Sequence, residues 1–267
     1  MRERSDRDVI AVERMSVTYM SGGKAVHAVK NCSFCVPKGE IVGLVGESGS
    51  GKSSALMAIP GLPPSGTLTS GEIYCRGVNL AILTEDDLSA WRWRRIAIVP
   101  QGAMNSFTPH LTIERHITEV LSHHLKIPKK TGRERAAELL SAAGLDSRVM
   151  TRYPHELSGG QKQRAALALA LACEPDFLLA DEPTTALDVI TQKEVLETIV
   201  SIVRERGMGL LLVTHDLPLA AGMCDTLIVM KDGEIAESGP ARQVSKDPRH
   251  PYTRLLIRAI REMDVAR

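Results

Sequence analysis

A glycine-rich stretch early in the chain has the residue types and spacing of a phosphate-binding loop. Residues 46–53 read GESGSGKS, after a short apolar run and before a helical pattern. Glycines let such a loop turn sharply, so that successive backbone N–H groups point at phosphate oxygens. The pattern predicts that Lys52 binds the β- and γ-phosphates of a nucleotide and that Ser53 binds Mg²⁺. The predicted nucleotide-binding residues here are Gly46, Glu47, Ser48, Gly49, Ser50, Gly51, Lys52, Ser53 and Ser54.

Two acids follow another apolar run farther along the chain. The stretch FLLADEP (177–183) contains Asp181 and Glu182 at the end of a predicted buried strand. In open α/β sheets, ligand sites form at the carboxyl ends of strands. We expect Asp181 to bind Mg²⁺ through a water molecule and Glu182 to polarise the water that attacks the γ-phosphate. Alone, the two acids would suit a solvated turn; the phosphate loop favours the catalytic interpretation.

Two further polar residues follow apolar strand patterns. His215 ends the run LLLVTH, and Gln101 ends IAIVPQ. If these strands share one parallel sheet, His215 lies at the same edge as Asp181 and can hydrogen-bond the γ-phosphate. The amide of Gln101 can reach the metal or the water. Each residue, taken singly, also fits an ordinary surface position.

A second glycine pair precedes a helical pattern in the sequence LSGGQ (157–161). The hydroxyl of Ser158 and the N–H groups of Gly159 and Gly160 suit a γ-phosphate. Because the first loop belongs to a different lobe, we expect this second site to serve a nucleotide bound by another molecule.

These motifs require strands and helices that alternate along the chain. The alternation predicts an α/β fold with a parallel sheet, preceded by a pair of N-terminal strands. Helical spacing between residues 102 and 171 predicts an inserted helical lobe. The strand patterns cover 10–19, 28–40, 41–46, 70–80, 95–101, 176–183, 209–216 and 226–239, and helical patterns begin at Lys52 and cover 191–206.

Together these motifs resemble those of the ATPase subunit of an ATP-binding cassette (ABC) transporter. The resemblance extends from about Val9 to Leu256 and rests on GESGSGKS, Gln101, LSGGQ, FLLADE, ALD (186–188) and His215, in family order. It implies a P-loop NTPase with a RecA-like core, an N-terminal antiparallel β subdomain and an inserted α-helical subdomain. It also implies a single ABC ATPase domain over 8–260, with its helical subdomain at about 102–171 and tails at 1–7 and 261–267.

The resemblance assigns roles to individual residues. Two cassettes are expected to pack head to tail around two ATP molecules, with Tyr19 stacking on adenine. Glu182, His215 and Gln101 are the implied catalytic residues, and the implied Mg²⁺ ligands are Ser53, Gln101 and Asp181. The residues expected to contact the ATP of the partner subunit are Ser158, Gly159, Gly160, Gln161 and Asp188.

Two segments are similar to the oligopeptide, dipeptide and nickel importer branch of that family. They are VPQGAMNSFTP (99–109) and HPYTRLL (250–256). The branch implies a second, different ATPase subunit, two membrane permeases and an extracytoplasmic substrate-binding protein, with this chain at the cytoplasmic face of the inner membrane. No cysteine follows Leu256, so we expect no iron–sulfur cluster. The choice between peptides and nickel or a metal chelate stays open, as does homodimer versus heterodimer.

Composition argues against other classes of function. The formal net charge of the 267-residue chain is only +1, so we expect no nucleic-acid partner. The N-terminal residues are charged rather than apolar, so we expect no secretory signal. A soluble ABC ATPase acting on nucleic acid or ribosomes is one alternative, and the single cassette disfavours it. A non-catalytic regulatory cassette is another, and Glu182 and His215 disfavour it.

Cysteine and histidine patterns offer little support for a metal site. Cys32 and Cys35 form a CxxC in a strand-like run, where positions three apart point to opposite faces. Four histidines gather in the predicted helical lobe without carboxylate or cysteine at ligand spacing. We therefore expect exposed helix positions at His110, His116, His123 and His124.

Overall fold

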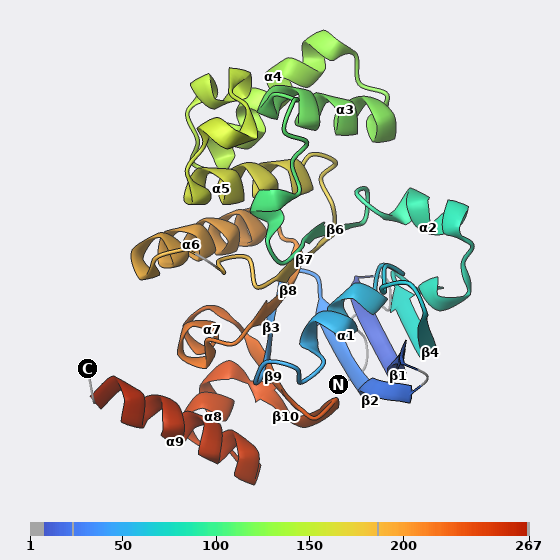
Figure 1. Cartoon of the computed structure of the whole chain (residues 1–267), viewed down its shortest axis with the longest axis vertical. Helices are drawn as coiled ribbons and strands as arrows, with labels where there is room; N and C mark the ends of the chain where they lie inside the picture. The colour runs from blue at the N-terminus through green and yellow to red at the C-terminus, as the bar shows by residue number, and fades with distance from the viewer. Residues whose placement is uncertain (1–7, 23, 186, 266–267) are drawn as a thin grey trace. The chain divides into compact units, whose positions relative to one another are not determined.

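The computed structural model of this chain describes residues 8–22, 24–185 and 187–265, with side chains in the last helix described to Ala259. The chain forms two compact units. Unit 1 comprises Met1–Leu88 with Gly209–Arg267, and unit 2 comprises Ser89–Met208. Figure 1 shows the elements of each unit, which are described separately below.

Unit 1 contains an antiparallel sheet with the strand order β2-β1-β4-β5. The strands are β1 (Val9–Ser21), β2 (Lys24–Pro37), β4 (Thr67–Cys75) and β5 (Val78–Asn79). This sheet matches the predicted N-terminal β subdomain. Gly23, between β1 and β2, lies outside the described residues. The strand pattern at 70–80 divides at Arg76-Gly77, where both residues have positive φ.

A second set of strands in unit 1 has the order β10-β9-β3-β8. They are β3 (Ile41–Val45), β8 (Gly209–Thr214), β9 (Thr226–Lys231) and β10 (Glu234–Pro240). Strand β3 pairs in parallel with β8 and β9. Every residue of β3 is buried, as expected for a parallel strand covered on both faces. The predicted α/β class with parallel strands is confirmed.

The strand pattern at 226–239 forms a hairpin of two strands rather than one strand. Asp232 and Gly233 occupy its turn with φ of 48° and 84°. Two successive positive φ values are what a tight hairpin turn requires, and Asp-Gly is a preferred pair there. Strand β10 consequently runs antiparallel to β9.

Helices cover the strands of unit 1 (Figure 1). Helix α1 (Lys52–Ala58) packs against β1, β2 and β8, and α7 (Leu217–Met223) packs on β3 and β8. Helix α8 (Ala241–Lys246) contacts α7, β9 and β10, while α9 (Pro251–Val265) contacts β10. Helix α9 thus occupies part of the predicted tail 261–267; residues 266–267 and the predicted tail 1–7 lie outside the described residues. The short helix η1 (Leu80–Ile82) follows β5, and α2 (Glu85–Trp91) spans the division between the units.

Unit 2 combines a parallel strand pair with a group of helices. Strands β6 (Ile96–Val99) and β7 (Phe177–Asp181) pair in parallel. Helix α5 contacts α3, α4 and α6, so the predicted helical region is a packed group (Figure 1). The division into one domain of 8–260 with a helical lobe at 102–171 stays a prediction. The helices are η2 (Ala103–Asn105), α3 (Ile113–Leu125), α4 (Lys129–Ala142), η3 (Ser147–Thr151), η4 (Pro154–Glu156), α5 (Gly159–Ala170) and α6 (Val189–Glu205).

Among the described residues, no helix is both long enough and apolar enough to cross a bilayer.

A buried carboxylate fixes the start of α9 in unit 1. Glu237, on β10, is 9% exposed and accepts hydrogen bonds from the backbone N–H groups of Arg249 (2.8 Å) and His250 (3.0 Å). Burial alone would raise the pKa of Glu237, but these N–H donors outweigh it and hold the pKa below its ordinary value. The ionised carboxylate therefore ties the segment before α9 to the sheet.

Removing this carboxylate should destabilise unit 1. We expect Glu237→Ala to cost about 2–3 kcal/mol of unfolding free energy, because two part-buried backbone N–H groups lose their charged acceptor. Since the folded pKa lies below the ordinary 4.5, the stabilisation should be present above that pH and be lost as pH falls through the folded pKa. Urea unfolding at several pH values measures both effects. Glu234→Ala, at an exposed position of the same strand, is the control; equal losses for the two variants would contradict the role of Glu237.

Candidate nucleotide site

The predicted phosphate loop connects β3 to α1 in unit 1. Gly46, Gly49 and Gly51 have φ of 153°, 81° and 101°. A Cβ atom at Gly46 would lie 2.3 Å from the carbonyl oxygen of Met230, and one at Gly51 would lie 2.1 Å from that of Ala28. These two positions can hold only glycine without displacement of neighbouring backbone. The loop is thus pressed against the strands beneath it, and Gly49 faces open space.

Lys52 is almost fully buried within this loop. Its side chain is 4% exposed, and its Nζ donates to the carbonyl oxygens of Gly46 at 2.9 Å and Glu47 at 2.7 Å. The neighbouring loop residues Glu47, Ser48 and Gly49 are exposed. A buried ammonium group beneath an exposed glycine loop fits a ligand that carries phosphates.

Tyr19, the residue expected to stack on adenine, lies beside the same loop. Its hydroxyl donates to Ser54 Oγ at 2.8 Å. Ser53 and Ser54 are half-buried in the first turn of α1. Unit 1 therefore brings the predicted adenine-binding and phosphate-binding residues together.

Strand register places His215 at the edge where the loop begins. Val45 of β3 pairs with Thr214 of β8, so Gly46 and His215 each follow the last paired residue of adjacent parallel strands. His215 is exposed there. Its predicted position at the carboxyl edge of the sheet is confirmed, and its contact with a γ-phosphate stays a prediction.

In unit 2, the predicted catalytic acid is held by two side chains. Val99 of β6 pairs with Ala180 of β7, so Gln101 and Glu182 emerge at one edge. Glu182 Oε2 accepts hydrogen bonds from Gln101 Nε2 at 3.1 Å and from Thr185 Oγ1 at 3.0 Å. Asp181 is 4% exposed at the end of β7. The sequence predicted the grouping of Gln101 with the two acids, whereas the contact of Thr185 was missed.

The backbone at Glu182 is itself unusual. Its φ is +43°, in the left-handed region that non-glycine residues seldom occupy. Such a conformation costs free energy and tends to occur at functional positions. The strain and the two hydrogen bonds together fix the direction of the carboxylate.

The second glycine motif, also in unit 2, forms the start of α5. Ser158 Oγ accepts from the N–H of Gln161 at 3.3 Å, and Gln161 Oε1 accepts from the N–H of Ser158 at 3.1 Å, which is a capping box. A Cβ at Gly160 would lie 2.8 Å from Thr191 Cγ2, at the start of α6. The motif therefore packs closely on the segment that carries Asp188.

Asp188 is the N-cap of α6. Its carboxylate accepts from Thr191 Oγ1 at 2.6 Å and from Thr191 N at 3.0 Å. These two hydrogen bonds lower the pKa of Asp188. Ala186 of the predicted ALD motif lies outside the described residues. The partner-facing roles of Ser158, Gly159, Gly160, Gln161 and Asp188 stay predictions.

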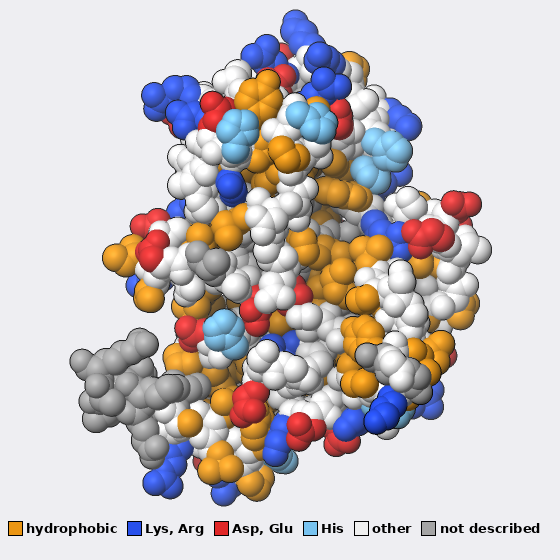
Figure 2. All heavy atoms as spheres, in the orientation of Figure 1, with side chains coloured by type: hydrophobic (Ala, Val, Ile, Leu, Met, Phe, Trp, Pro, Cys, Tyr) orange, Lys and Arg blue, Asp and Glu red, His pale blue; other side chains and the backbone are white. Residues whose placement is uncertain are grey.

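The cysteines and histidines show no metal-binding arrangement. Within 8–22, 24–185 and 187–265, no group of three or more His, Cys, Asp or Glu residues could hold a metal ion. Cys32 is buried and Cys35 exposed, on opposite faces of β2. Pale-blue histidine side chains are visible over the helical part of unit 2 in Figure 2.

Only His123 keeps the expected exposed helix position, because His110 lies in a turn before α3 and His116 and His124 are half-buried on it. His116 Nε2 accepts from Thr108 N at 2.9 Å, so its Nδ1 carries the proton and donates to Thr112 O at 2.8 Å. Both ring nitrogens of His116 are therefore engaged in fixing the start of α3.

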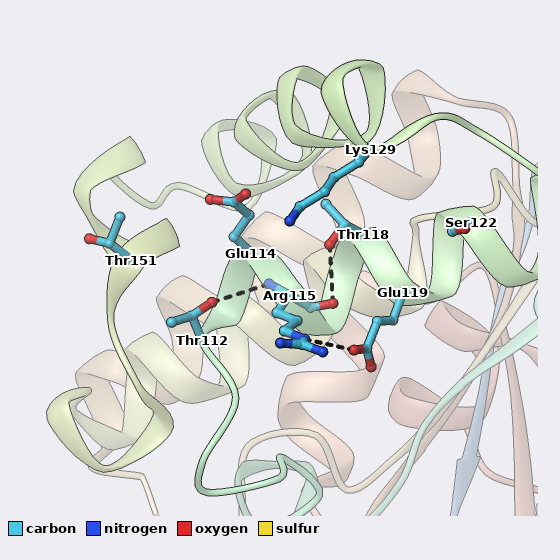
Figure 3. Close-up of a pocket in the computed structure, with 8 residues that line it drawn as sticks. All are labelled: Thr112, Glu114, Arg115, Thr118, Glu119, Ser122, Lys129 and Thr151. Atoms are coloured by element: carbon cyan, nitrogen blue, oxygen red, sulfur yellow. Dashed lines mark hydrogen bonds and ion pairs between the residues drawn. The ribbon is translucent and has the colours of Figure 1, made fainter.

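A separate pocket in unit 2 lies along α3 (Figure 3). Its wall contains an Arg115–Glu119 ion pair of 2.9 Å, and Glu114 pairs with Arg133 at 3.4 Å. Three of its charged residues are thus in ion pairs, one of them with Arg133, which does not line the pocket. None of the predicted site residues lines it.

Comparison with protein families gives two matches. Residues 29–185 match the family described as ABC transporter. Residues 236–267 match the family described as oligopeptide/dipeptide transporter, C-terminal region.

Curated relatives match over nearly the whole chain. The chain is 42% identical over 263 residues to the peptidoglycan transport ATP-binding protein YejF of Agrobacterium fabrum, covering 97% of this chain and 48% of that protein. It is 39% identical over 263 residues to the probable D,D-dipeptide transport ATP-binding protein DdpD of Escherichia coli K12, covering 97% of this chain and 80% of that protein. The chain spans about half the length of YejF and of the OppD relatives from mycobacteria.

A solved structure is also similar. It is the dimeric structure of a post-hydrolysis state of the ATP-binding cassette MJ0796 bound to ADP and Pi, with a TM-score of 0.78 and 33% identity. The match covers 87% of this chain and 99% of that one.

The glycine geometry of the phosphate loop leads to a paired prediction. Gly51→Ala should lower the unfolding free energy by about 3 kcal/mol or more, since it combines a positive φ with a backbone clash. Gly49→Ala, with positive φ but no neighbour within 4 Å, should cost about 1–2 kcal/mol. Urea unfolding of both variants provides the comparison. Equal costs would show that close packing does not restrict the loop at Gly51.

Proposed function

The chain belongs to the ABC transporter family, and we propose that it binds and hydrolyses ATP to power the uptake of peptides through separate membrane permeases. The observation that carries the cargo class is the match of residues 236–267 to the C-terminal region of oligopeptide/dipeptide transporters. The names of YejF and DdpD, which refer to peptidoglycan and D,D-dipeptide transport, support the same class. Nickel or a metal chelate has no such support here, so peptides are the proposed cargo.

The residues of unit 1 fit the binding of ATP. Tyr19 supplies an aromatic face for adenine, and the backbone of the glycine loop supplies donors for the phosphates. Lys52 exchanges its loop carbonyl partners for phosphate oxygens. This exchange accounts for a buried lysine, because its charge gains a charged partner when nucleotide binds.

Three residues are the proposed ligands of Mg²⁺. Ser53, Gln101 and, through water, Asp181 supply oxygen atoms of the kind that this ion prefers. When bound, Mg²⁺ neutralises part of the phosphate charge and orients the phosphates.

The catalytic group in this proposal is Glu182. Its carboxylate polarises the attacking water, Gln101 and Thr185 fix its direction, and His215 binds the γ-phosphate. Thr185 thereby gains a positioning role.

Completion of the site requires a second cassette, which we propose to be a different chain. Ser158, Gly159, Gly160, Gln161 and Asp188 then contact the nucleotide held by the partner's phosphate loop. The MJ0796 cassette, which is dimeric with ADP and Pi, supports this arrangement. Closure on ATP and reopening after hydrolysis drive the permeases at the cytoplasmic face of the membrane, and an extracytoplasmic binding protein delivers the peptide.

Two substitutions separate binding from hydrolysis. Lys52→Ala should raise the Kd for Mg·ATP at least about tenfold, because a buried charge contact with phosphate is lost. Glu182→Gln should retain ATP binding and lower the hydrolysis rate by about 10²- to 10⁴-fold. Calorimetric binding and phosphate-release assays measure these effects. Unchanged hydrolysis in Glu182→Gln would remove Glu182 as the catalytic base.

The transport function is tested with the complete assembly. Co-expression with the permeases, second cassette and binding protein of the proposed transporter should yield a complex in which a labelled dipeptide enters vesicles only with ATP. Nickel ions serve as the competing cargo. The Glu182→Gln complex should assemble but transport nothing. Uptake of nickel without uptake of peptide would overturn the proposed cargo class. Recovery of the chain with ribosomes or nucleic acid would overturn the transporter role.

A further inference from the structure

Arg164 of α5 joins three helices of unit 2. Its Nη1 donates to Thr198 Oγ1 of α6 at 3.0 Å and to the carbonyl oxygen of Ala143, at the end of α4, at 3.4 Å. Its Nη2 donates to Glu194 Oε2 of α6 at 3.2 Å. The side chain of Arg164 is only 18% exposed. The guanidinium group therefore uses its fixed fork of donors to connect α5 with both neighbouring helices.

The acceptors of Arg164 are groups that their own helices leave available. The Thr198 hydroxyl already donates to Glu194 O at 2.8 Å, so its oxygen can accept from the guanidinium group. Ala143 is the C-cap of α4, where carbonyl groups have no partner within the helix. A Cβ at Gly144 would lie 2.7 Å from Arg164 Nη1, so the chain after α4 packs closely on this group. The contacts of Arg164 are therefore built into the packing of the helices.

These contacts continue the close packing at the starts of α5 and α6. Gly160 and Arg164 are four residues apart and share one face of α5. Thr191, Glu194 and Thr198, at spacings of three and four, share one face of α6. A Cβ at Gly160 would lie 2.8 Å from Thr191 Cγ2, and Arg164 meets its two partners farther along both helices. The contacts run in the same order, so α5 and α6 lie side by side with their first turns at the same end (Figure 1).

Two helix starts that lie together in this way repel one another. Each N-terminus carries the partial positive charge of its helix dipole. Ser158 caps α5 and Asp188 caps α6, and both residues are proposed to contact the nucleotide of the second cassette. Arg164 and Glu194 stand at the same position relative to these two caps. Their ion pair opposes the repulsion just behind the caps.

We propose that Arg164 is a positioning residue for the nucleotide site of the second cassette: by joining α5 to Glu194 and Thr198 of α6, it holds Ser158 and Asp188 at the separation that the partner-bound triphosphate requires. The two caps then move together when the cassettes close on ATP. Arg164 acts through the two helix starts and not on the phosphates themselves. The inference rests on the proposed pairing with a second cassette.

The first test measures the two helix starts in the full chain without a partner. Arg164→Met keeps an unbranched apolar side chain but removes every donor. It should raise the hydrogen-exchange rates of the backbone N–H groups in the first turns of α5 and α6 about tenfold, because the charged link between the helices is lost. Lys193→Met, which removes an exposed cation paired with Glu197 within α6, should leave these rates unchanged. Unchanged exchange in Arg164→Met would overturn the inference.

The second test measures ATP hydrolysis by the complete proposed transporter. Arg164→Met should lower kcat about tenfold. The Kd of the isolated chain for Mg·ADP should stay unchanged, because Lys52 and its loop belong to unit 1 and the contacts of Arg164 lie in unit 2. Arg164→Lys, which keeps the charge but not the fork of donors, should have an intermediate kcat. A merely structural role would lower the urea midpoint and leave kcat per folded molecule unchanged, and that result would overturn the inference.

A third comparison tests whether Arg164 acts through α6. In a background of Glu194→Ala and Thr198→Val, Arg164→Met should lower kcat little further, because its partners on α6 are already absent. Effects that add fully would contradict the proposed link. Failure of the unaltered assembly to hydrolyse ATP would instead overturn the proposed function, and the exchange rates would still decide whether Arg164 holds the two helix starts together.

Discussion

The close approach of backbone to backbone at the phosphate loop is the constraint on which the proposed site depends. Gly46 and Gly51 lie where any side chain would meet the carbonyl oxygens of Met230 and Ala28. This contact brings the loop down onto the strands, which buries Lys52 and leaves Glu47, Ser48 and Gly49 facing outward. Without it, the lysine would extend into water and bind phosphate as an ordinary surface charge.

Strand register organises the other functional groups in the same way within each unit. The pairing of Val45 with Thr214 aligns the phosphate loop with His215, and the pairing of Val99 with Ala180 aligns Gln101 with Glu182. Parallel strands that end together deliver polar residues to one edge, which is why open α/β sheets bind ligands there. Capping interactions of Ser158 and Asp188 then fix the first turns of α5 and α6.

Local patterns in the sequence predicted the strands, the helices and most candidate site residues, because those patterns act over a few residues. The hairpin at Asp232-Gly233 was a local signal that the prediction passed over. Contacts such as Thr185 with Glu182 and Tyr252 with Lys231 depend on side-chain direction and on segments distant in sequence. Periodicity and motif spacing carry no information about such contacts, so the structure was needed to find them.

In the proposed mechanism, the left-handed backbone at Glu182 sets thermodynamic stability against turnover at a single position. Glycine adopts φ of +43° without the steric cost that a Cβ imposes, about 1 kcal/mol or more. Replacement of Glu182 by glycine would therefore raise the stability of the folded chain and remove the carboxylate proposed for catalysis.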